Sequence, residues 1–119
     1  MNTKTVGKTS EESAVNYLIE QGYEILARNY YSQFGEIDII AMKNNRISAI
    51  EVKYRKNPLV SVFNTIPKSK IKKLENTLYY YLSINNYTDK YDLGIDALLI
   101  EDINNRKNIY FIKNIQLNF

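Results

Sequence analysis

The 119-residue sequence contains neither cysteine nor histidine. Without cysteine the chain can form no disulfide framework, no thiolate zinc site and no cysteine nucleophile. Without histidine it can have neither a Ser-His-Asp triad nor a histidine-ligated zinc, and it cannot use a histidine base. Any catalysis must therefore come from carboxylates, lysine, tyrosine or hydroxyl groups. Any bound metal should be a hard cation that prefers oxygen ligands.

Long apolar runs are also absent, since no segment approaches the ~20 apolar residues that span a membrane. The first five residues lack the apolar core of a signal peptide. We therefore expect a cytoplasmic protein with no membrane partner. The net charge of +3 and the pI ≈ 9.0 give a mild basic excess, which is compatible with nucleic acid as a partner.

Helical patterns occur twice in the chain. Thr9 or Ser10 can cap a first helix, which Gly22 should stop. Pro67 suits the first turn of a second helix, which should run to about Asn85. Apolar residues recur at helical spacing along this second segment, at Ile71, Leu74, Leu78 and Leu82.

Strand patterns, dense in Ile and Val with polar residues interleaved, fill much of the remaining chain. The expected strands cover residues 23–28, 36–42, 46–54, 97–100 and 109–112. The resulting order α-β-β-β-α-β-β predicts an α/β fold, with a mixed central sheet flanked by helices. We expect residues 1–8 to form a flexible tail and residues 9–119 to form one domain.

A polar turn at Asn44-Asn45 fixes the expected pairing of the second and third strands. Asparagine tolerates the positive φ of a two-residue hairpin loop. Such a loop pairs residues whose numbers sum to 89, so that Asp38 faces Glu51. Glu36 then faces Lys53, which projects from the same side of its strand as Glu51. Facing side chains lie about 4.5–5.5 Å apart at Cβ, and like charges there are destabilising. The two carboxylates should therefore favour a cation between them.

Asp38 followed by Glu51-x-Lys53 on paired strands resembles the active site of the restriction-endonuclease-like nucleases, the PD-(D/E)xK superfamily. The flanking residues narrow this resemblance to the YraN family of predicted endonucleases. The residues that carry it are Gly7-Lys8-Thr9-Ser10-Glu11, Ala14, Tyr17-Leu18, Gly22, Arg28-Asn29, Gly35-Glu36-Ile37-Asp38, Glu51-Val52-Lys53, Arg55 and Lys70. They extend through nearly the whole chain, and the resemblance implies the restriction-endonuclease-like core that the element order also fits.

The resemblance implies metal-dependent hydrolysis of phosphodiester bonds in DNA. Asp38 and Glu51 would hold Mg²⁺ or Mn²⁺, with the Val52 carbonyl and Glu11 as further ligands. Lys53 would orient the attacking water and stabilise the transition state. Small stand-alone domains of this superfamily resemble Holliday-junction resolvases, so branched DNA is one expected substrate and a homodimer one expected assembly.

The charged residues expected around Asp38, Glu51 and Lys53 also have simpler, structural interpretations. Glu11 stands in the first turn of the expected helix, where the helix dipole alone favours a carboxylate. Glu36 has a supporting role or a structural one, paired with Lys53 or Arg55. The basic residues expected to contact nucleic acid also fit an ordinary solvated face, and Lys70 is the best candidate for a phosphate contact. The expected nucleic-acid contacts are Lys70, Arg55, Lys56 and Lys68.

Two other functions stay open. The chain could be a non-catalytic nucleic-acid-binding module that retains the nuclease fold. It could also be a structural partner protein whose carboxylates bind a stabilising ion. The complete set of Asp38, Glu51 and Lys53 favours the enzyme, because loss of activity usually leaves such a set broken.

Overall fold

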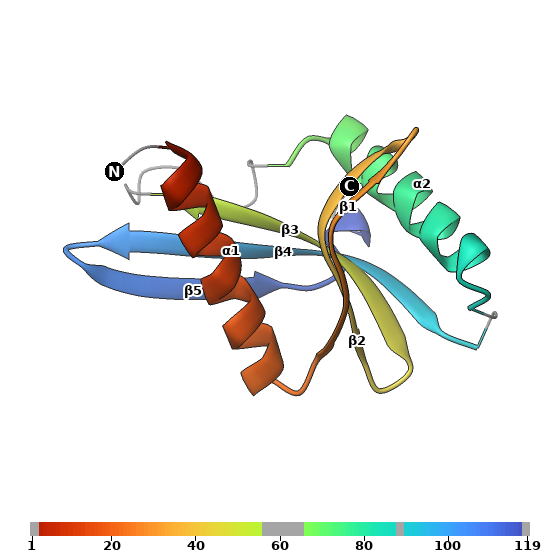
Figure 1. Cartoon of the computed structure of the whole chain (residues 1–119), viewed down its shortest axis with the longest axis horizontal. Coiled ribbons are helices and arrows are strands. Elements are labelled where there is room, and N and C mark those ends of the chain that lie inside the picture. Colours follow the sequence, from red (N-terminus) through yellow and green to blue (C-terminus); the bar gives the residue numbers. More distant parts are fainter. Residues whose placement is uncertain (1–2, 56–65, 88–89, 118–119) are drawn as a thin grey trace.

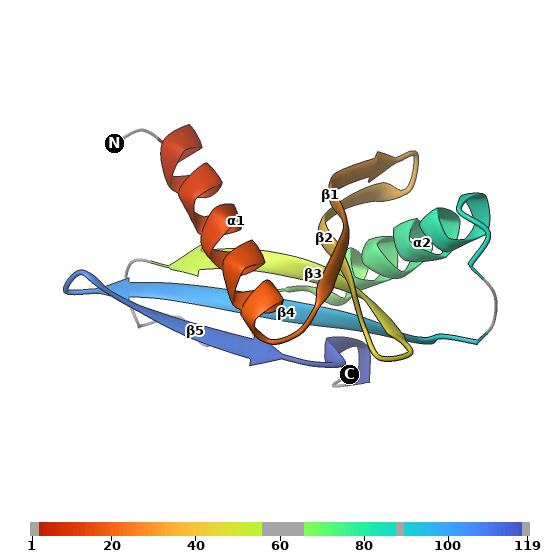
Figure 2. The same cartoon turned by 60° about the horizontal axis from the view of Figure 1, so that its bottom comes forward.

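One mixed β-sheet with a helix on each face forms the framework of the molecule (Figures 1 and 2). The computed structural model describes residues 3–55, 66–87 and 90–117, and it describes side chains from Glu11 on. Within this part of the chain, no helix is long and apolar enough to cross a membrane. The α/β architecture confirms the fold class that the sequence predicts.

The sheet contains five strands in the order β1-β2-β3-β4-β5. The elements are α1 (Thr3–Glu20), β1 (Glu24–Ser32), β2 (Gly35–Lys43), β3 (Arg46–Arg55), α2 (Lys68–Ile84), β4 (Asp92–Ile103), β5 (Arg106–Ile112) and the short 3₁₀ helix η2 (Ile115–Leu117). β3 and β4 are parallel, and the other neighbouring pairs are antiparallel. A parallel pair needs a long crossover, and α2 lies within the segment that connects these two strands.

Each face of the sheet has its own apolar core. On one face α1 packs Ala14, Val15 and Leu18 in one buried cluster with sheet residues such as Ile50. On the other face α2 contributes its buried residues to a cluster that contains Ile47 and Ala49 of β3. Side chains alternate along a strand, so Glu51, two residues after Ala49, faces α2. The fold thus places this carboxylate beneath the helix that follows it in the chain.

A buried ion pair joins β3 and β4 at a distance from Glu51. Asp96 is fully buried and receives two hydrogen bonds from Arg46, from Nη1 at 2.8 Å and from Nη2 at 2.7 Å. Arg46 also donates to Ser48 and Asn114, and the Asn114 N–H donates to Asp96. Gly94 leaves room for this arrangement, because a Cβ there would collide with the Arg46 guanidinium.

Replacing Asp96 should be strongly destabilising. The substitution Asp96→Ala leaves the partly buried Arg46 without its partner, which typically lowers the free energy of unfolding by about 3–5 kcal/mol. Asp92→Ala is the matched control, since Asp92 is exposed on the same strand and should cost no more than about 0.5 kcal/mol. Urea denaturation of both variants measures the difference. A loss for Asp96→Ala as small as that of the control would contradict a structural role.

Several boundaries differ from the sequence-based expectation, and the two largest shifts are at the starts of the first helix and of β4. The first helix begins at Thr3, several residues before the predicted cap at Thr9 or Ser10. The division into a tail over residues 1–8 and one domain over residues 9–119 stays a prediction. A glycine such as Gly7 lowers the stability of a helix by only about 1 kcal/mol relative to alanine, so the helix continues through it. The residues predicted to cap the helix, Thr9 and Ser10, therefore lie inside it. β4 begins at Asp92 instead of residue 97, because its pairing with β3 starts at Arg46 and Asp92.

Candidate active site

The β2–β3 hairpin has the register that the sequence predicts. Asn44 has a φ of 55°, and the strands pair from Lys43 with Arg46 to Ile39 with Ile50. The pairing ends there, one step before Asp38 and Glu51. The expected backbone pairing of these two residues is therefore wrong. The β2–β3 pairing also ends before Glu36 and Lys53, so the expected pairing of these two residues is not formed, and Glu36 pairs with Tyr31 of β1 on its other side.

Where the backbone pairing of β2 with β3 ends, the Asp38 side chain accepts a hydrogen bond from β3 in place of a backbone carbonyl. Its Oδ2 accepts a 2.8 Å hydrogen bond from the Val52 N–H, which a continued ladder would give to a backbone carbonyl of β2. β2 leaves β3 at this point and continues with β1 as a twisted hairpin that projects from the sheet (Figure 2). In a strand the N–H and C=O of one residue point to the same side, so the Val52 carbonyl is also directed toward β2. Val52 is not among the residues that line the cavity between these strands and α2, and its role as a metal ligand stays a prediction.

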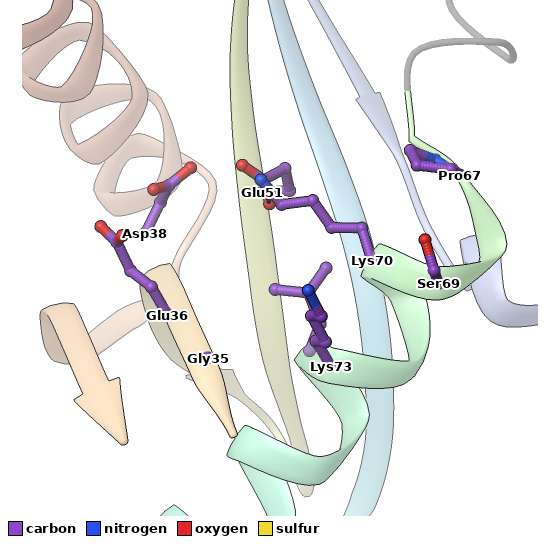
Figure 3. Close-up of a pocket in the computed structure, with 9 residues that line it drawn as sticks. Gly35, Glu36, Asp38, Glu51, Pro67, Ser69, Lys70 and Lys73 are labelled. Atoms are coloured by element: carbon purple, nitrogen blue, oxygen red, sulfur yellow. Dashed lines mark ion pairs between the residues drawn. The ribbon is translucent and has the colours of Figure 1, made fainter. Parts of the chain in front are cut away.

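This cavity has a volume of about 400 Å³ and lies between β2, β3 and the first turns of α2 (Figure 3). Asp38 and Glu36 reach it from β2, Glu51 from β3, and Lys70 and Lys73 from α2. The remaining lining residues are Gly35, Pro67, Ser69 and Leu74. Carboxylates thus line the strand side of the cavity, and ammonium groups come from the helix side.

Lys70 is the cation that neutralises Glu51. Its Nζ lies 3.3 Å from Glu51 Oε2, and the Glu51 side chain is buried while that of Lys70 is 43% exposed. Among the residues that the structure describes, none forms an ion pair with Asp38. Burial, followed by the neighbouring charge of Glu51, raises the pKa of Asp38 to about 6, against the lowering effects of the Val52 N–H and of Lys70. The carboxylate pair therefore carries more negative charge than Lys70 alone offsets.

The raised pKa of Asp38 makes stability depend on pH. In the folded protein this group holds its proton up to about pH 6, against an ordinary value of 3.8. The contribution of Asp38 to the free energy of unfolding is therefore fully present below its pKa in the unfolded chain. It is lost as pH rises through its pKa in the folded protein. Asp38→Asn lacks this dependence, so its unfolding free energy relative to the parent should rise by roughly 1–3 kcal/mol between about pH 4 and pH 7.5. Urea denaturation without divalent ions measures it, and a difference independent of pH would contradict the assignment.

The structure brings Asp38, Glu51, Glu36 and Lys70 together around one cavity. Lys53 follows Glu51 by two residues and so shares its face of β3. The Lys53 side chain forms no hydrogen bond or ion pair with the residues that the structure describes. Its catalytic role stays a prediction. Within the described part of the chain, no three carboxylates form a metal-binding group, although Glu36 lines the same cavity.

The other predicted residues that the structure describes do not line the cavity. Glu11 accepts a 3.4 Å hydrogen bond from Asn29 of β1 and does not line the cavity. Arg55 donates to the Tyr54 carbonyl at 3.0 Å. Lys68 is exposed in the first turn of α2, and Lys56 lies outside the described residues.

Sequence reasoning missed two features of the site. It assigned Lys70 only to phosphate, whereas Lys70 also pairs with Glu51. It also overlooked Lys73 and Ser69 as lining residues. Lys73 could have been predicted from the sequence, because Lys70 was already a candidate and residues three apart on a helix lie on the same face.

Comparison with known proteins places the chain in a family. The family model described as "Uncharacterised protein family UPF0102" matches residues 10–100, which include every residue that lines the cavity. A UPF0102 protein of Lachnoclostridium phytofermentans is 40% identical over 117 residues, which cover 92% of this chain and 96% of the relative. UPF0102 protein FN1370 of Fusobacterium nucleatum is 41% identical over 99 residues, 82% of each chain. A UPF0102 protein of Helicobacter hepaticus is 42% identical over 102 residues, 86% of this chain and 89% of the relative. The chain therefore belongs to the UPF0102 family.

Proposed function

We propose that this protein is a metal-dependent nuclease that hydrolyses phosphodiester bonds in DNA. The observation that carries the proposal is the pair of neighbouring carboxylates, Asp38 and Glu51, in a cavity that lysines approach from the opposite side. Adjacent carboxylates in a partly buried site need positive charge, and the raised pKa of Asp38 is the sign that they lack it. A divalent ion would supply that charge.

The donor set fits Mg²⁺ or Mn²⁺. Every side chain that could ligate a metal in the cavity offers oxygen, which hard cations prefer. Mg²⁺ is usually held by one or two carboxylates, with water and substrate phosphate as its other ligands. The pair of Asp38 and Glu51 meets this requirement without a third carboxylate. When bound, the ion would activate water and offset the charge that develops on the phosphate.

The residues on the helix side suit a phosphate. Lys70 and Lys73 lie three residues apart on α2 and line the cavity together. Pro67 precedes this helix and provides no side-chain cap, and a helix N-terminus attracts anions through its backbone N–H groups. A DNA backbone held by the lysines would place a phosphate opposite the carboxylates. Lys53, on the same face as Glu51, is proposed to orient the attacking water.

One observation favours a second candidate function. The ion pair between Lys70 and Glu51 neutralises Glu51 without any metal. A protein that retained this fold only to bind nucleic acid would benefit from such a pair, because it stabilises the buried carboxylate. This candidate predicts DNA binding that divalent ions do not change, and no cleavage.

Cleavage of a substrate panel tests the proposal. Labelled single-stranded, duplex, flap and four-way-junction DNAs, with an RNA of matching sequence, are incubated with the protein in Mg²⁺ or Mn²⁺. The expected result is cleavage of at least one DNA that EDTA abolishes. Binding without cleavage in either metal would favour the second candidate. Preferential cleavage of the junction would identify branched DNA as the substrate.

A further inference from the structure

We propose that Phe34 and Tyr80 form a stacking platform for unpaired bases, next to the cavity that holds Asp38 and Glu51. The inference rests on the proposed function for its nucleic-acid ligand and goes beyond it in naming the substrate class. The strand bound at the cavity should contain unpaired nucleotides, because a base inside a duplex already has both of its faces stacked.

The two rings lie at the junction of the β1–β2 hairpin and α2. Phe34 precedes the first residue of β2, and its ring centroid is 5.8 Å from that of Tyr80 at an interplanar angle of 62°. The hairpin and α2 lie close to one another at this end of the molecule (Figures 1 and 2). Phe34 remains 40% exposed and Tyr80 39% exposed, so the contact leaves much of both side chains open to a ligand.

The platform is continuous with the cavity. Gly35 follows Phe34 and lines the cavity, and a Cβ built on Gly35 would lie 3.5 Å from the Cβ of Lys73. Along α2, Lys70, Lys73, Thr77 and Tyr80 are spaced by three or four residues and so lie on one side of the helix. At 1.5 Å per residue, this stripe places Tyr80 about 15 Å from Lys70 along the helix axis.

The chemistry of this stripe matches a single strand of nucleic acid. Lysines that can meet phosphates occupy one end, and exposed aromatic rings occupy the other. Proteins that bind single strands combine these two features, because every base has a π-face that an aromatic ring can contact. Isolated exposed aromatic residues need no explanation, but this pair continues directly into a cavity lined by lysines.

Binding of single-stranded DNA to the metal-free protein tests the platform. In EDTA, Phe34→Ala and Tyr80→Ala should each weaken the binding of a labelled single strand by about 5- to 100-fold, measured by fluorescence anisotropy. The affinity for a blunt duplex should stay unchanged. Tyr79→Ala is the matched control, because Tyr79 is 58% exposed on the same helix but lines a different cavity, with Glu75 and Gln116. It should bind the single strand as the parent does.

A second readout reports stacking directly. The sequence contains no tryptophan, so Phe34→Trp introduces a single tryptophan as a fluorescent probe. Its emission should be quenched when a single strand binds, whereas that of Tyr110→Trp, at a 43% exposed site on β5, should not. Quenching in both variants or in neither would overturn the inference. So would the absence of single-strand binding, or equal affinities for Phe34→Ala and Tyr79→Ala.

The outcomes separate this inference from the proposed function. Cleavage of duplex DNA with no effect of Phe34→Ala would overturn the platform and leave the nuclease proposal standing. Loss of single-strand binding in Phe34→Ala, with no cleavage in any metal, would support the platform and reject the nuclease. If Phe34→Ala abolishes self-association and changes no DNA affinity, the rings are a contact between two copies of the chain, and the inference fails.

Discussion

Asp38→Asn and Glu51→Gln should each reduce metal-dependent DNA cleavage by more than about 10³-fold, the loss expected when several kcal/mol of transition-state stabilisation disappear. Both substitutions preserve side-chain shape and remove the charge that would hold a divalent ion. In Asp38→Asn the side-chain amide oxygen can still accept the hydrogen bond that the Val52 N–H now donates to the carboxylate. Initial cleavage rates at saturating Mg²⁺ measure the effect.

The conformational stability of the variants shows whether the loss of cleavage comes from the missing charge or from unfolding. Asp38→Asn removes the repulsion from Glu51, so the metal-free variant should unfold at a urea concentration no lower than the parent at neutral pH. Glu12→Gln is the control, since Glu12 is exposed and pairs with Arg28 outside the cavity. It should retain the parent cleavage rate. Activity of Asp38→Asn within tenfold of the parent would reject the carboxylate pair as the catalytic centre.

Replacing Lys53 and replacing Lys70 should have different kinetic effects, because the two lysines have different proposed roles. Lys53→Ala should lower kcat by about 10²- to 10³-fold, as when a group that stabilises the transition state is lost, and leave Mg²⁺ affinity unchanged. Lys70→Ala should instead raise KM and tighten Mg²⁺ binding, because it frees Glu51 from its ion pair. It should also reduce the slope of log affinity against log salt by about one.

Steady-state kinetics and Mg²⁺ titrations of the two variants provide this comparison. If Lys70→Ala carries the loss in kcat and Lys53→Ala does not, then Lys70 acts on the reaction and the resemblance misplaces the catalytic lysine. If neither variant changes any of these quantities, both lysines belong to a solvated face.

Local patterns in the sequence were sufficient to predict the β2–β3 hairpin and the second helix. Asn44 adopts the positive φ that the turn requires, and Pro67 precedes a helix that ends at Ile84. These features depend on neighbouring residues alone. The proximity of Asp38 and Glu51 followed from the same turn, because the register of a two-residue loop fixes which residues approach each other.

Features that depend on the tertiary arrangement could not be predicted from local sequence patterns. The sequence could not show that the Asp38 carboxylate replaces a backbone acceptor and lets β2 leave β3. Nor could it show that the crossover helix brings Lys70 onto Glu51. The contact between Arg46 and Asp96 joins residues 50 apart in sequence and requires the parallel pairing of β3 and β4. The sequence pattern placed Arg46 at the start of an expected strand and assigned it no partner.

The position of a bound Mn²⁺ ion would show whether Asp38 and Glu51 form a metal site. Anomalous scattering from crystals grown with Mn²⁺ locates the ion without reference to activity. We expect a peak within coordination distance of both the Asp38 and Glu51 carboxylates, with the Lys70 ammonium displaced from its 3.3 Å contact with Glu51. An intact Lys70–Glu51 pair with no peak at this site, in crystals whose lattice leaves the cavity open, would contradict this expectation.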